Sequence, residues 1–390
     1  MSSNLTLALL LLLCGPAAAD PLVVFFVDPT YMDFSGDAMV ICTPSGRHYV
    51  MDGGYMEEYQ GFYWSCGEAK VLPLLDSLEV DYLDGVLATH PDADHVGGLV
   101  AVVDHYQGLL ETVWDSGWPY GGTWIYEEFL QEVEQSGATY LVPRRGDLLD
   151  WDDQMTVEVV HPVDPLDPDN TNNASVSVRM TYGDVTFLFT GDMETEGGED
   201  VIMDAVSSGI IDDITADVLK VAHHGSRTST SGEWLDAVQP SLAAICVGAG
   251  NPYGHPHGEV LSRLYARGID VYRTDQSGTF YIATDGDSIY VNSLPPGGGQ
   301  GPEEVDQLIA YPSPATSRVT FAWDSSGEST ATISVYNLLG ERVLYRSASG
   351  GSYEWDLSLE DGGLLSPGLY MVHLELEGGE TCTEYFAVSR

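Results

Sequence analysis

The chain is poor in basic residues. It has 14 Lys and Arg among 390 residues, against 60 Asp and Glu, so the formal net charge is −46. Affinity for nucleic acid comes mainly from Lys and Arg that neutralise phosphates, so this balance excludes a basic nucleic-acid-binding module. It also excludes a polybasic membrane-surface protein. Intrinsic disorder is disfavoured, because 44% of the residues are hydrophobic and 10% are aromatic. The length predicts two or three domains.

Long hydrophobic runs are also scarce. The apolar run at residues 5–13 is too short for a transmembrane helix, which needs about 20 residues. Ala17–Ala19 follows it, as in the cleavage site of a secretory signal peptide. We therefore predict a signal peptide over residues 1–19 and no transmembrane span in the mature chain. An uncleaved N-terminal anchor is the alternative.

Cysteine is rare, and no two cysteines have the C-x-x-C spacing of a metal or redox motif. Four remain after removal of the signal peptide: Cys42, Cys66, Cys246 and Cys382. An exported protein can oxidise such thiols. Cys42 and Cys66 are closest in sequence and are candidates for a bridge, but four thiols allow three pairings, so the disulfide status stays open.

A Pro/Gly-rich linker at residues 295–302 divides the mature chain into parts 20–294 and 303–390. The large part alternates strand-like and helix-like segments, which predicts an α/β domain. The predicted strands are 22–27, 38–42, 48–51, 85–88, 185–190, 218–221 and 242–247, and the helices 71–77, 233–238 and 258–266. The small part has only short strands between turns, which predicts an all-β sandwich. Its strands are expected at 319–323, 331–336, 341–345, 352–357, 368–375 and 383–388.

Four potential metal ligands fall within six residues after the strand at 85–88: His90, Asp92, Asp94 and His95. His90 and Asp92 are two apart in an extended turn and can share one ion. Asp94 and His95 enter the next helix and can reach a second ion. A solvated acidic turn is the alternative for this motif taken alone.

Three further elements carry the same residue types after strand-like runs. Asp192 follows the apolar run 187–189, where a bridging carboxylate would be placed. Paired histidines follow the strand at 218–221, and His255 and His257 lie in the Gly-His-Pro-His turn at 254–257. Each of these turns alone is readily an ordinary polar loop. Together with the first motif they predict a metal site built from His90, Asp92, Asp94, His95, Asp192, His223, His224 and His255. The other histidines outside the motifs, His48, His105, His161 and His373, are interpreted as structural.

The motifs together resemble the metallo-β-lactamase superfamily and, within it, the extracytoplasmic hydrolase domain of ComEC-type competence proteins. The resemblance covers about residues 22–292 and rests on H-x-D-x-D-H at 90–95, N-N-x-S at 172–175, T-G-D at 190–192, L-K-V-x-H-H-G-S at 219–226 and N-x-Y-G-H-P-H at 251–257. It implies an αββα sandwich with a di-metal centre at one edge. The segment 29–35 is longer than the resemblance leads us to expect.

The resemblance also implies roles for individual residues. His90, Asp92 and Asp192 would hold one ion, and Asp94, His95 and Asp192 the other. His223 or His224, with His255, would complete the ligand shells, and the choice between the paired histidines stays open. Asp94, His224 and Lys220 are catalytic candidates, Lys220 as a group that orients a phosphate or carboxylate. The candidates for substrate contact or ligand support are Asp52, Asn172, Asn173, Ser175, Ser226 and His257. The two divalent ions are expected to be zinc, with manganese or iron as alternatives.

The C-terminal part resembles the sorting domain of type IX secretion substrates, a relative of the FlgD-like immunoglobulin-type domains. The resemblance rests on residues 311–315, 333–340 and 365–370. It implies recognition by the export machinery and a location outside the cell, secreted or on the outer cell surface.

The sequence therefore predicts an exported di-metal hydrolase, specifically a phosphodiesterase that uses a metal-bridged hydroxide on a small or polymeric phosphoester. Residues 20–301 hold 10 basic and 46 acidic residues, a net charge of −36. That charge repels polyanions, so tight binding to duplex nucleic acid is not expected. A lactamase or lactonase and a non-catalytic cell-surface scaffold are the alternatives.

Overall fold

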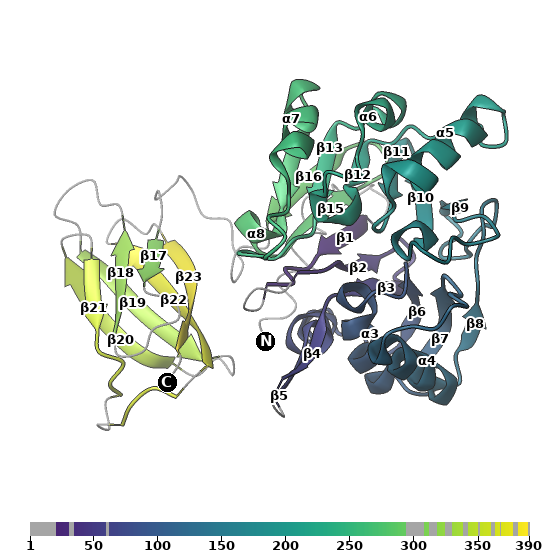
Figure 1. Ribbon diagram of the computed structural model, residues 1–390. Coiled ribbons are helices and arrows are strands. Elements are labelled where there is room, and N and C mark those ends of the chain that lie inside the picture. Colours follow the sequence, from purple (N-terminus) through teal and green to yellow (C-terminus); the bar gives the residue numbers. More distant parts are fainter. Residues whose placement is uncertain are drawn as a thin grey trace. The chain divides into compact units, whose positions relative to one another are not determined.

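The computed structural model describes residues 21–30, 35–59, 62–293, 308–311, 318–323, 330–337, 342–349, 352–359, 363–366, 368–376 and 381–388. The chain divides into two compact units after Ser293 (Figure 1). The predicted signal peptide (1–19) and linker (295–302) lie outside the described residues, as does most of the segment 29–35. Within the described part of the chain, no helix has the length and hydropathy needed to cross a membrane.

Two β-sheets form the centre of the first unit. One has the strand order β16-β15-β1-β2-β3-β6-β7-β8, and the other β14-β13-β12-β11-β10-β9. The first contains β1 (Leu22–Phe26), β2 (Ala38–Cys42), β3 (His48–Gly53), β6 (Leu83–Ala88), β7 (Leu110–Asp115), β8 (Thr139–Leu141), β15 (Phe280–Thr284) and β16 (Ile289–Ser293). The second contains β9 (Met155–His161), β10 (Ser177–Tyr182), β11 (Val185–Phe189), β12 (Val218–Lys220), β13 (Leu242–Ile245) and β14 (Asp270–Arg273).

The main hydrophobic core lies between these sheets. It takes side chains from one face of each, among them Phe26 and Phe280, whose rings stack at 5.0 Å. Tyr49 stacks on Trp151 at 4.5 Å and donates its hydroxyl to the Trp151 carbonyl at 2.9 Å. Strands such as β1 and β11 are buried along their whole length because both of their faces are covered.

Helices cover the outer faces of the sheets (Figure 1). The helices are α2 (Leu72–Ser77), α3 (Ala93–His105), α4 (Trp124–Ser136), α5 (Asp200–Ser207), α6 (Gly232–Val238), α7 (Gly258–Ala266) and α8 (Thr274–Ser277). A second core joins α5, α6 and α7 to the outer face of β11–β14. Thr123 caps α4 and Ser231 caps α6 by accepting from backbone amides. The short ribbon of β4 (Met56–Tyr59) and β5 (Phe62–Ser65) precedes a single π-turn at Gly67–Val71. The predicted αββα sandwich is confirmed.

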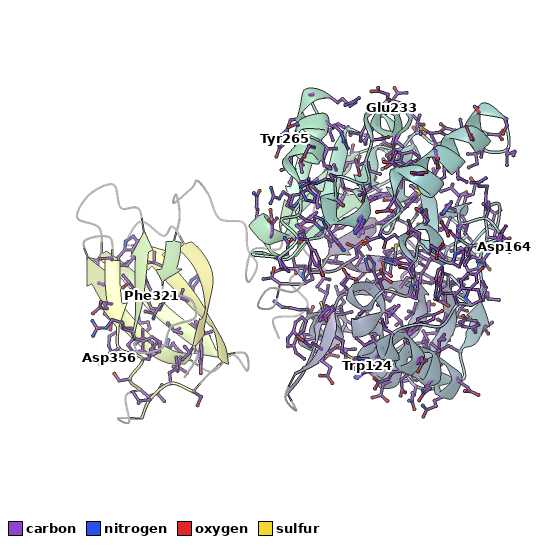
Figure 2. All side chains as sticks on the ribbon, viewed as in Figure 1. Trp124, Asp164, Glu233, Tyr265, Phe321 and Asp356 are labelled. Atoms are coloured by element: carbon purple, nitrogen blue, oxygen red, sulfur yellow. The ribbon has the colours of Figure 1, made fainter. Side chains whose placement is uncertain are left out.

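The second unit is built from strands alone in its described residues. One sheet has β17 (Leu308–Tyr311), β18 (Val319–Trp323) and β21 (Ser352–Trp355), and the other has β20 (Arg342–Ser349), β19 (Thr330–Asn337), β22 (Gly368–Leu376) and β23 (Thr381–Val388). Both sheets contribute to one core, which includes Phe321 (Figure 2). The predicted all-β sandwich is confirmed, and β17 is a strand that the sequence analysis did not predict.

Candidate metal centre

The candidate site is formed by loops that follow the carboxyl ends of strands from both sheets. His90, Asp92 and the start of α3 follow β6, Asp192 follows β11, and His223 and His224 follow β12. The glycines of α3 permit this arrangement, since a Cβ on Gly97 would lie 2.5 Å from the backbone nitrogen of Met56, and one on Gly98 would overlap the Gly53 carbonyl. The helix therefore packs directly on the backbone, which brings its first turn to the edge of the sheet.

His95 has its ring fixed by a buried carboxylate. Its Nδ1 lies 2.8 Å from Asp52 Oδ2, and both side chains are fully buried. A carboxylate only accepts hydrogen bonds, so Nδ1 carries a proton, and Nε2 is the nitrogen that is left to face a cation. That Nε2 lies 3.2 Å from Asp192 Oδ1.

His90 is oriented in the same way through a hydroxyl. Thr89 Oγ1 donates to Asp52 Oδ2 at 2.8 Å and lies 3.0 Å from His90 Nδ1. Because the hydroxyl proton is already given to Asp52, the Thr89 oxygen accepts from His90 Nδ1. His90 Nε2 is then the free nitrogen, 3.7 Å from Asp92 Oδ2.

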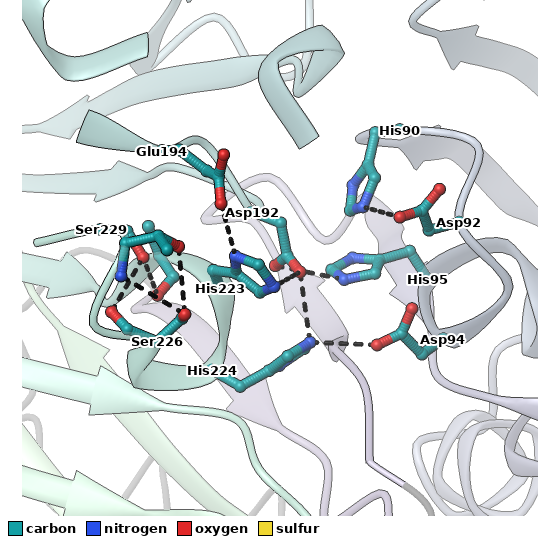
Figure 3. Close-up of polar contacts among 12 residues, drawn as sticks. His90, Asp92, Asp94, His95, Asp192, Glu194, His223, His224, Ser226 and Ser229 are labelled. Atoms are coloured by element: carbon teal, nitrogen blue, oxygen red, sulfur yellow. Dashed lines mark hydrogen bonds and ion pairs between the residues drawn. The ribbon is translucent and has the colours of Figure 1, made fainter. Parts of the chain in front are cut away.

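His224 completes the set from the opposite sheet (Figure 3). Its Nδ1 lies 2.9 Å from the Cys246 carbonyl oxygen, which fixes the proton there. Its Nε2 lies 3.1 Å from Asp94 Oδ2 and 3.3 Å from Asp192 Oδ2. His224 and its neighbour His223 both have positive φ, 53° and 52°, and this tight turn points the two rings in different directions.

The donor set fits a divalent cation. The Nε2 atoms of His90 and His95 and the Oδ1 atom of Asp192 are buried and have no hydrogen-bond partner among the described residues. Leaving buried polar atoms unpaired costs free energy, and a cation bound between them would remove that cost. Imidazole nitrogens with carboxylate oxygens are ligands that Zn²⁺, Mn²⁺ and Fe²⁺ accept. By proximity, one group of candidate ligands is Asp37, His95, Asp192 and His224.

Charges in the site reinforce one another. Burial opposes the charged form of Asp192, but His224, His95 and His223 together lower the pKa of its carboxyl well below the usual value. Burial likewise opposes a charged His95, but Asp192 and Asp52 raise its pKa well above the usual value. Such mutual shifts are typical of functional sites, where ionised groups of opposite sign are held close in a protected space.

The paired histidines, between which the sequence could not choose, occupy different positions. His224 is buried at the junction of Asp94 and Asp192, whereas the side chain of His223 is 21% exposed. His223 Nε2 is 3.9 Å from Asp192 Oδ2, and its Nδ1 is 3.6 Å from Glu194 Oε1. His224 therefore has the closer contacts to the carboxylates, and His223 lies over them with Glu194 behind it.

The other two predicted histidines lie toward the rim. The His255 ring is centred 5.7 Å from that of His223 and 6.2 Å from that of His224. Burial and the neighbouring histidines lower the pKa of His255 to about 4, so its ring is neutral at pH 7. His257 precedes α7 and accepts at Nδ1 from the Arg227 backbone amide at 3.1 Å.

Three of the residues predicted to contact substrate instead make hydrogen bonds within the loops of the site: Ser175, Asn173 and Ser226. Buried Ser175 accepts from the Asp192 amide at 3.0 Å, and Asn173 accepts from the Glu194 amide at 2.9 Å. Ser226 is buried and lies 3.1 Å from the Thr228 hydroxyl. Asn172 is half-buried in the same short turn, and its carbonyl accepts from the Ser175 amide. These contacts hold the Asp192 and His224 loops in shape.

The side chain of Lys220 is buried. Its side chain is 1% exposed and pairs with the buried carboxylate of Asp37, so it cannot reach a phosphate in the open part of the site. Asp37, Thr89 and Glu194 belong to the site, but the sequence analysis gave them no role. A Gly-Asp pair such as Gly36-Asp37 is too common in turns to be a signal by itself.

The bridge considered between Cys42 and Cys66 does not form. Both are free thiols, as is Cys246. The Cys66 side chain packs against Gly54, where an added Cβ would lie 2.6 Å from its sulfur.

The αββα fold and an Asp/His cluster at the loop edge define a class of hydrolase-fold proteins. The chain belongs to the metallo-β-lactamase superfamily, whose family model matches residues 31–249. A model described as a secretion system C-terminal sorting domain matches residues 309–388.

Individual relatives narrow the class. The chain is 34% identical to ComE operon protein 3 of Bacillus subtilis strain 168 over 252 residues, 63% of this chain and 31% of that protein. It is 30% identical to competence protein ComA of Neisseria gonorrhoeae over 249 residues, 64% of this chain and 31% of that protein. The chain thus spans about a third of the length of these relatives. Among solved structures, it is similar to the short form of human tRNase Z, with 13% identity and a TM-score of 0.35 over 65% of this chain and 95% of that one.

Proposed function

We propose that the chain is an exported hydrolase that binds two divalent metal ions and cleaves phosphodiesters. The observation that carries the proposal is the set of three imidazole rings, each with its Nδ1 bonded to an acceptor. These bonds leave the Nε2 atoms of His90, His95 and His224 facing carboxylates. Such preorganised ligands hold an ion without having to rearrange.

Two groups of ligands share Asp192. His95 Nε2 lies near Asp192 Oδ1, and His224 Nε2 lies near Asp192 Oδ2 and Asp94 Oδ2. We assign His90 and Asp92 to one ion and Asp94, His95 and His224 to the other, with Asp192 between them. These residues would hold two ions, which when bound would supply an activated water and stabilise charge on the attacking and leaving oxygens. Zinc is the favoured metal, and the several carboxylates also suit manganese or iron.

The chain itself supplies groups that can contact water and substrate. Asp94 is the most exposed of the carboxylates around His224, with 32% of its side chain accessible. Its carboxylate can therefore accept a hydrogen bond from an entering water. His223 lies over the site with Nδ1 3.6 Å from Glu194 Oε1, and its partly exposed ring can contact a bound substrate.

The phosphodiester is proposed from the resemblance to competence-protein hydrolase domains and from the oxygen-rich ligand set. The net charge of −36 over residues 20–301 opposes the approach of long polyanions at low salt. We therefore propose that the substrate is a short phosphodiester, or a longer one whose charge is screened by salt, in preference to duplex nucleic acid. The sorting domain supports release or attachment outside the cell.

The experiment is a substrate panel with purified protein loaded with Zn²⁺ or Mn²⁺. The panel contains bis-p-nitrophenyl phosphate, single-stranded DNA and a chromogenic β-lactam. Cleavage of the phosphodiester that is lost in Asp94→Ala is the expected result. Cleavage of the lactam alone would contradict the choice of substrate. Absence of bound metal, with Asp94→Ala unchanged in every assay, would instead support a non-catalytic scaffold.

A further inference from the structure

A buried ion pair lies directly behind the metal centre. Lys220 is the last residue of β12, and Asp37 comes just before β2, so the pair connects the two sheets. Lys220 Nζ forms an ion pair with Asp37 Oδ2 and donates a hydrogen bond to the Val221 carbonyl at 2.9 Å. The two side chains are 1% and 0% exposed. The pair is therefore closed off from solvent and from any substrate.

Asp37 meets the ligand histidines at the nitrogen that faces away from the ion site. Its Oδ1 lies 3.1 Å from His224 Nδ1, and its Oδ2 lies 4.0 Å from His95 Nδ1. The Nε2 atoms of the same rings face Asp94 and Asp192. Asp37 is close to the other candidate ligands. An ion bound to the Nε2 atoms would, however, be on the opposite side of the two imidazole rings from Asp37.

The backbone fixes Asp37 in this place. Its amide donates to the Asp94 carbonyl at 3.1 Å, and its own carbonyl accepts from the Gly54 amide at 2.7 Å. A Cβ on Gly36 would overlap the Asp94 carbonyl, so the chain can approach only because glycine stands there. The Asp37 carboxylate is thus tied to the same loop that carries the ligand Asp94.

The pair joins an ammonium and a carboxylate that are both removed from water. A buried ion pair contributes little net stability, because both charges lose their hydration. An apolar pair of similar size often stabilises a core equally well. The position of this pair suggests a role other than stability.

We propose that the Lys220–Asp37 pair positions the metal centre: Lys220 holds Asp37 as an acceptor for His224 Nδ1–H, which directs His224 Nε2 at Asp94 and Asp192. This inference rests on the proposed function, because it concerns the same ion site. It makes Lys220 and Asp37 positioning residues, neither a substrate contact nor a metal ligand. In the structure the Cys246 carbonyl, 2.9 Å from the same nitrogen, is the acceptor with hydrogen-bond geometry, and Asp37 Oδ1 lies 3.1 Å away as an ion-pair partner.

Two charge-neutral double variants separate these roles. Asp37→Asn with Lys220→Met keeps an oxygen that can accept from His224 Nδ1. Asp37→Leu with Lys220→Met has a side chain of similar size and no acceptor. Neither leaves an unpaired buried charge, so both are expected to fold. Lys70→Met, the same change at the only other lysine, is the matched control. Co²⁺ affinity by competition with a chelator and the Co²⁺ absorption spectrum are the readouts, and neither requires turnover.

The expected result is near-native Co²⁺ affinity for the Asn variant and for Lys70→Met. The Leu variant should bind about 10- to 100-fold more weakly, with an altered spectrum. If Co²⁺ affinity falls equally in both double variants, Asp37 is a metal ligand. If both variants keep native Co²⁺ affinity, the pair has only a structural role. Either result overturns the proposal. If the Leu variant does not fold, Asp37→Ala with Lys220→Met replaces it. A wild-type protein that binds no Co²⁺ would instead contradict the proposed function itself.

Discussion

His95 donates its Nδ1 proton to Asp52 Oδ2 over 2.8 Å, with both side chains fully buried. Asp52 also accepts from the Thr89 amide and hydroxyl, each at 2.8 Å. Thr89 in turn accepts from His90. One carboxylate at the end of β3 thus orients histidines assigned to both ions, and the structure of the centre depends on residues that never touch a metal.

Thr89→Val should destabilise the protein even without metal. The valine has the same shape, but Asp52 loses one donor and His90 Nδ1 loses its nearest acceptor. An unpaired buried polar group costs about 1–3 kcal/mol. Urea unfolding in the presence of a chelator measures this loss, because bound metal then adds nothing to stability. Thr89→Ser keeps the hydroxyl and is the control; equal losses in the two variants would show that the hydrogen bonds contribute nothing.

Gly191→Ala should destabilise the protein more than Gly209→Ala. Both glycines have positive φ, 53° and 72°, so alanine strains the backbone at either position. A Cβ on Gly191 would lie 2.6 Å from Ser175 Oγ, whereas a Cβ on Gly209 meets nothing within 4 Å. We expect an additional loss of at least about 1 kcal/mol for Gly191→Ala in urea unfolding, together with weaker metal binding because Asp192 is displaced. If the two variants lose the same free energy of unfolding, the loop around Gly191 can accommodate a Cβ atom without cost.

Stability should fall with pH partly through His161. This buried ring donates from Nε2 to the Asn173 carbonyl at 2.8 Å, and burial lowers its pKa from 6.5 to about 4. Its contribution is complete above pH 6.5, because the ring is then neutral in both states. Below pH 6.5 the unfolded state gains the proton first, so stability is lost by about 1.4 kcal/mol per pH unit down to about pH 4.

The measurement is urea unfolding at pH 7 and pH 5 for the wild type and His161→Gln. Between these values His161 alone accounts for a loss of about 2 kcal/mol. The glutamine amide can still donate to Asn173 but does not titrate. A smaller loss in the variant is expected, and identical losses in the two proteins would rule out this role for His161.

Cys66 and Cys246 should resist alkylation in the native protein. Both thiols are fully buried. Burial raises the pKa of Cys66 to about 12 and also raises the pKa of Cys246. Since the thiolate is the reactive form, iodoacetamide should label them only after unfolding. Peptide mass spectrometry without reductant measures this, and it should also find Cys42 labelled in urea. A Cys42–Cys66 disulfide in that experiment would contradict the free thiols of the structure.

The fold and most of the candidate site could be predicted because ligands follow strands. A buried apolar run such as Phe187–Phe189 can be recognised from composition, and the turn after it places Asp192 at the sheet edge. Some of the strands that were not predicted are short or mixed. β8 spans three exposed residues, and β9 mixes polar with apolar positions, so neither was predicted.

Orientation was harder to predict than position. Lys220 stands in a three-residue strand whose residues are all buried, so no alternation shows which face it occupies. The choice between His223 and His224 depends on two consecutive residues with positive φ, which the sequence does not reveal. Asp37 takes its role from Asp94, Lys220 and His224, and these contacts join segments that are far apart in the chain.

The central claim is that Asp192 lies between two ions. Equilibrium dialysis against Zn²⁺ or Mn²⁺, followed by elemental analysis, tests it most directly. We predict two ions per chain for the wild type and for Asp184→Ala, an exposed carboxylate in the turn before β11. Asp192→Ala should lose both. One ion or none in the wild type, or two retained in Asp192→Ala, would contradict the account.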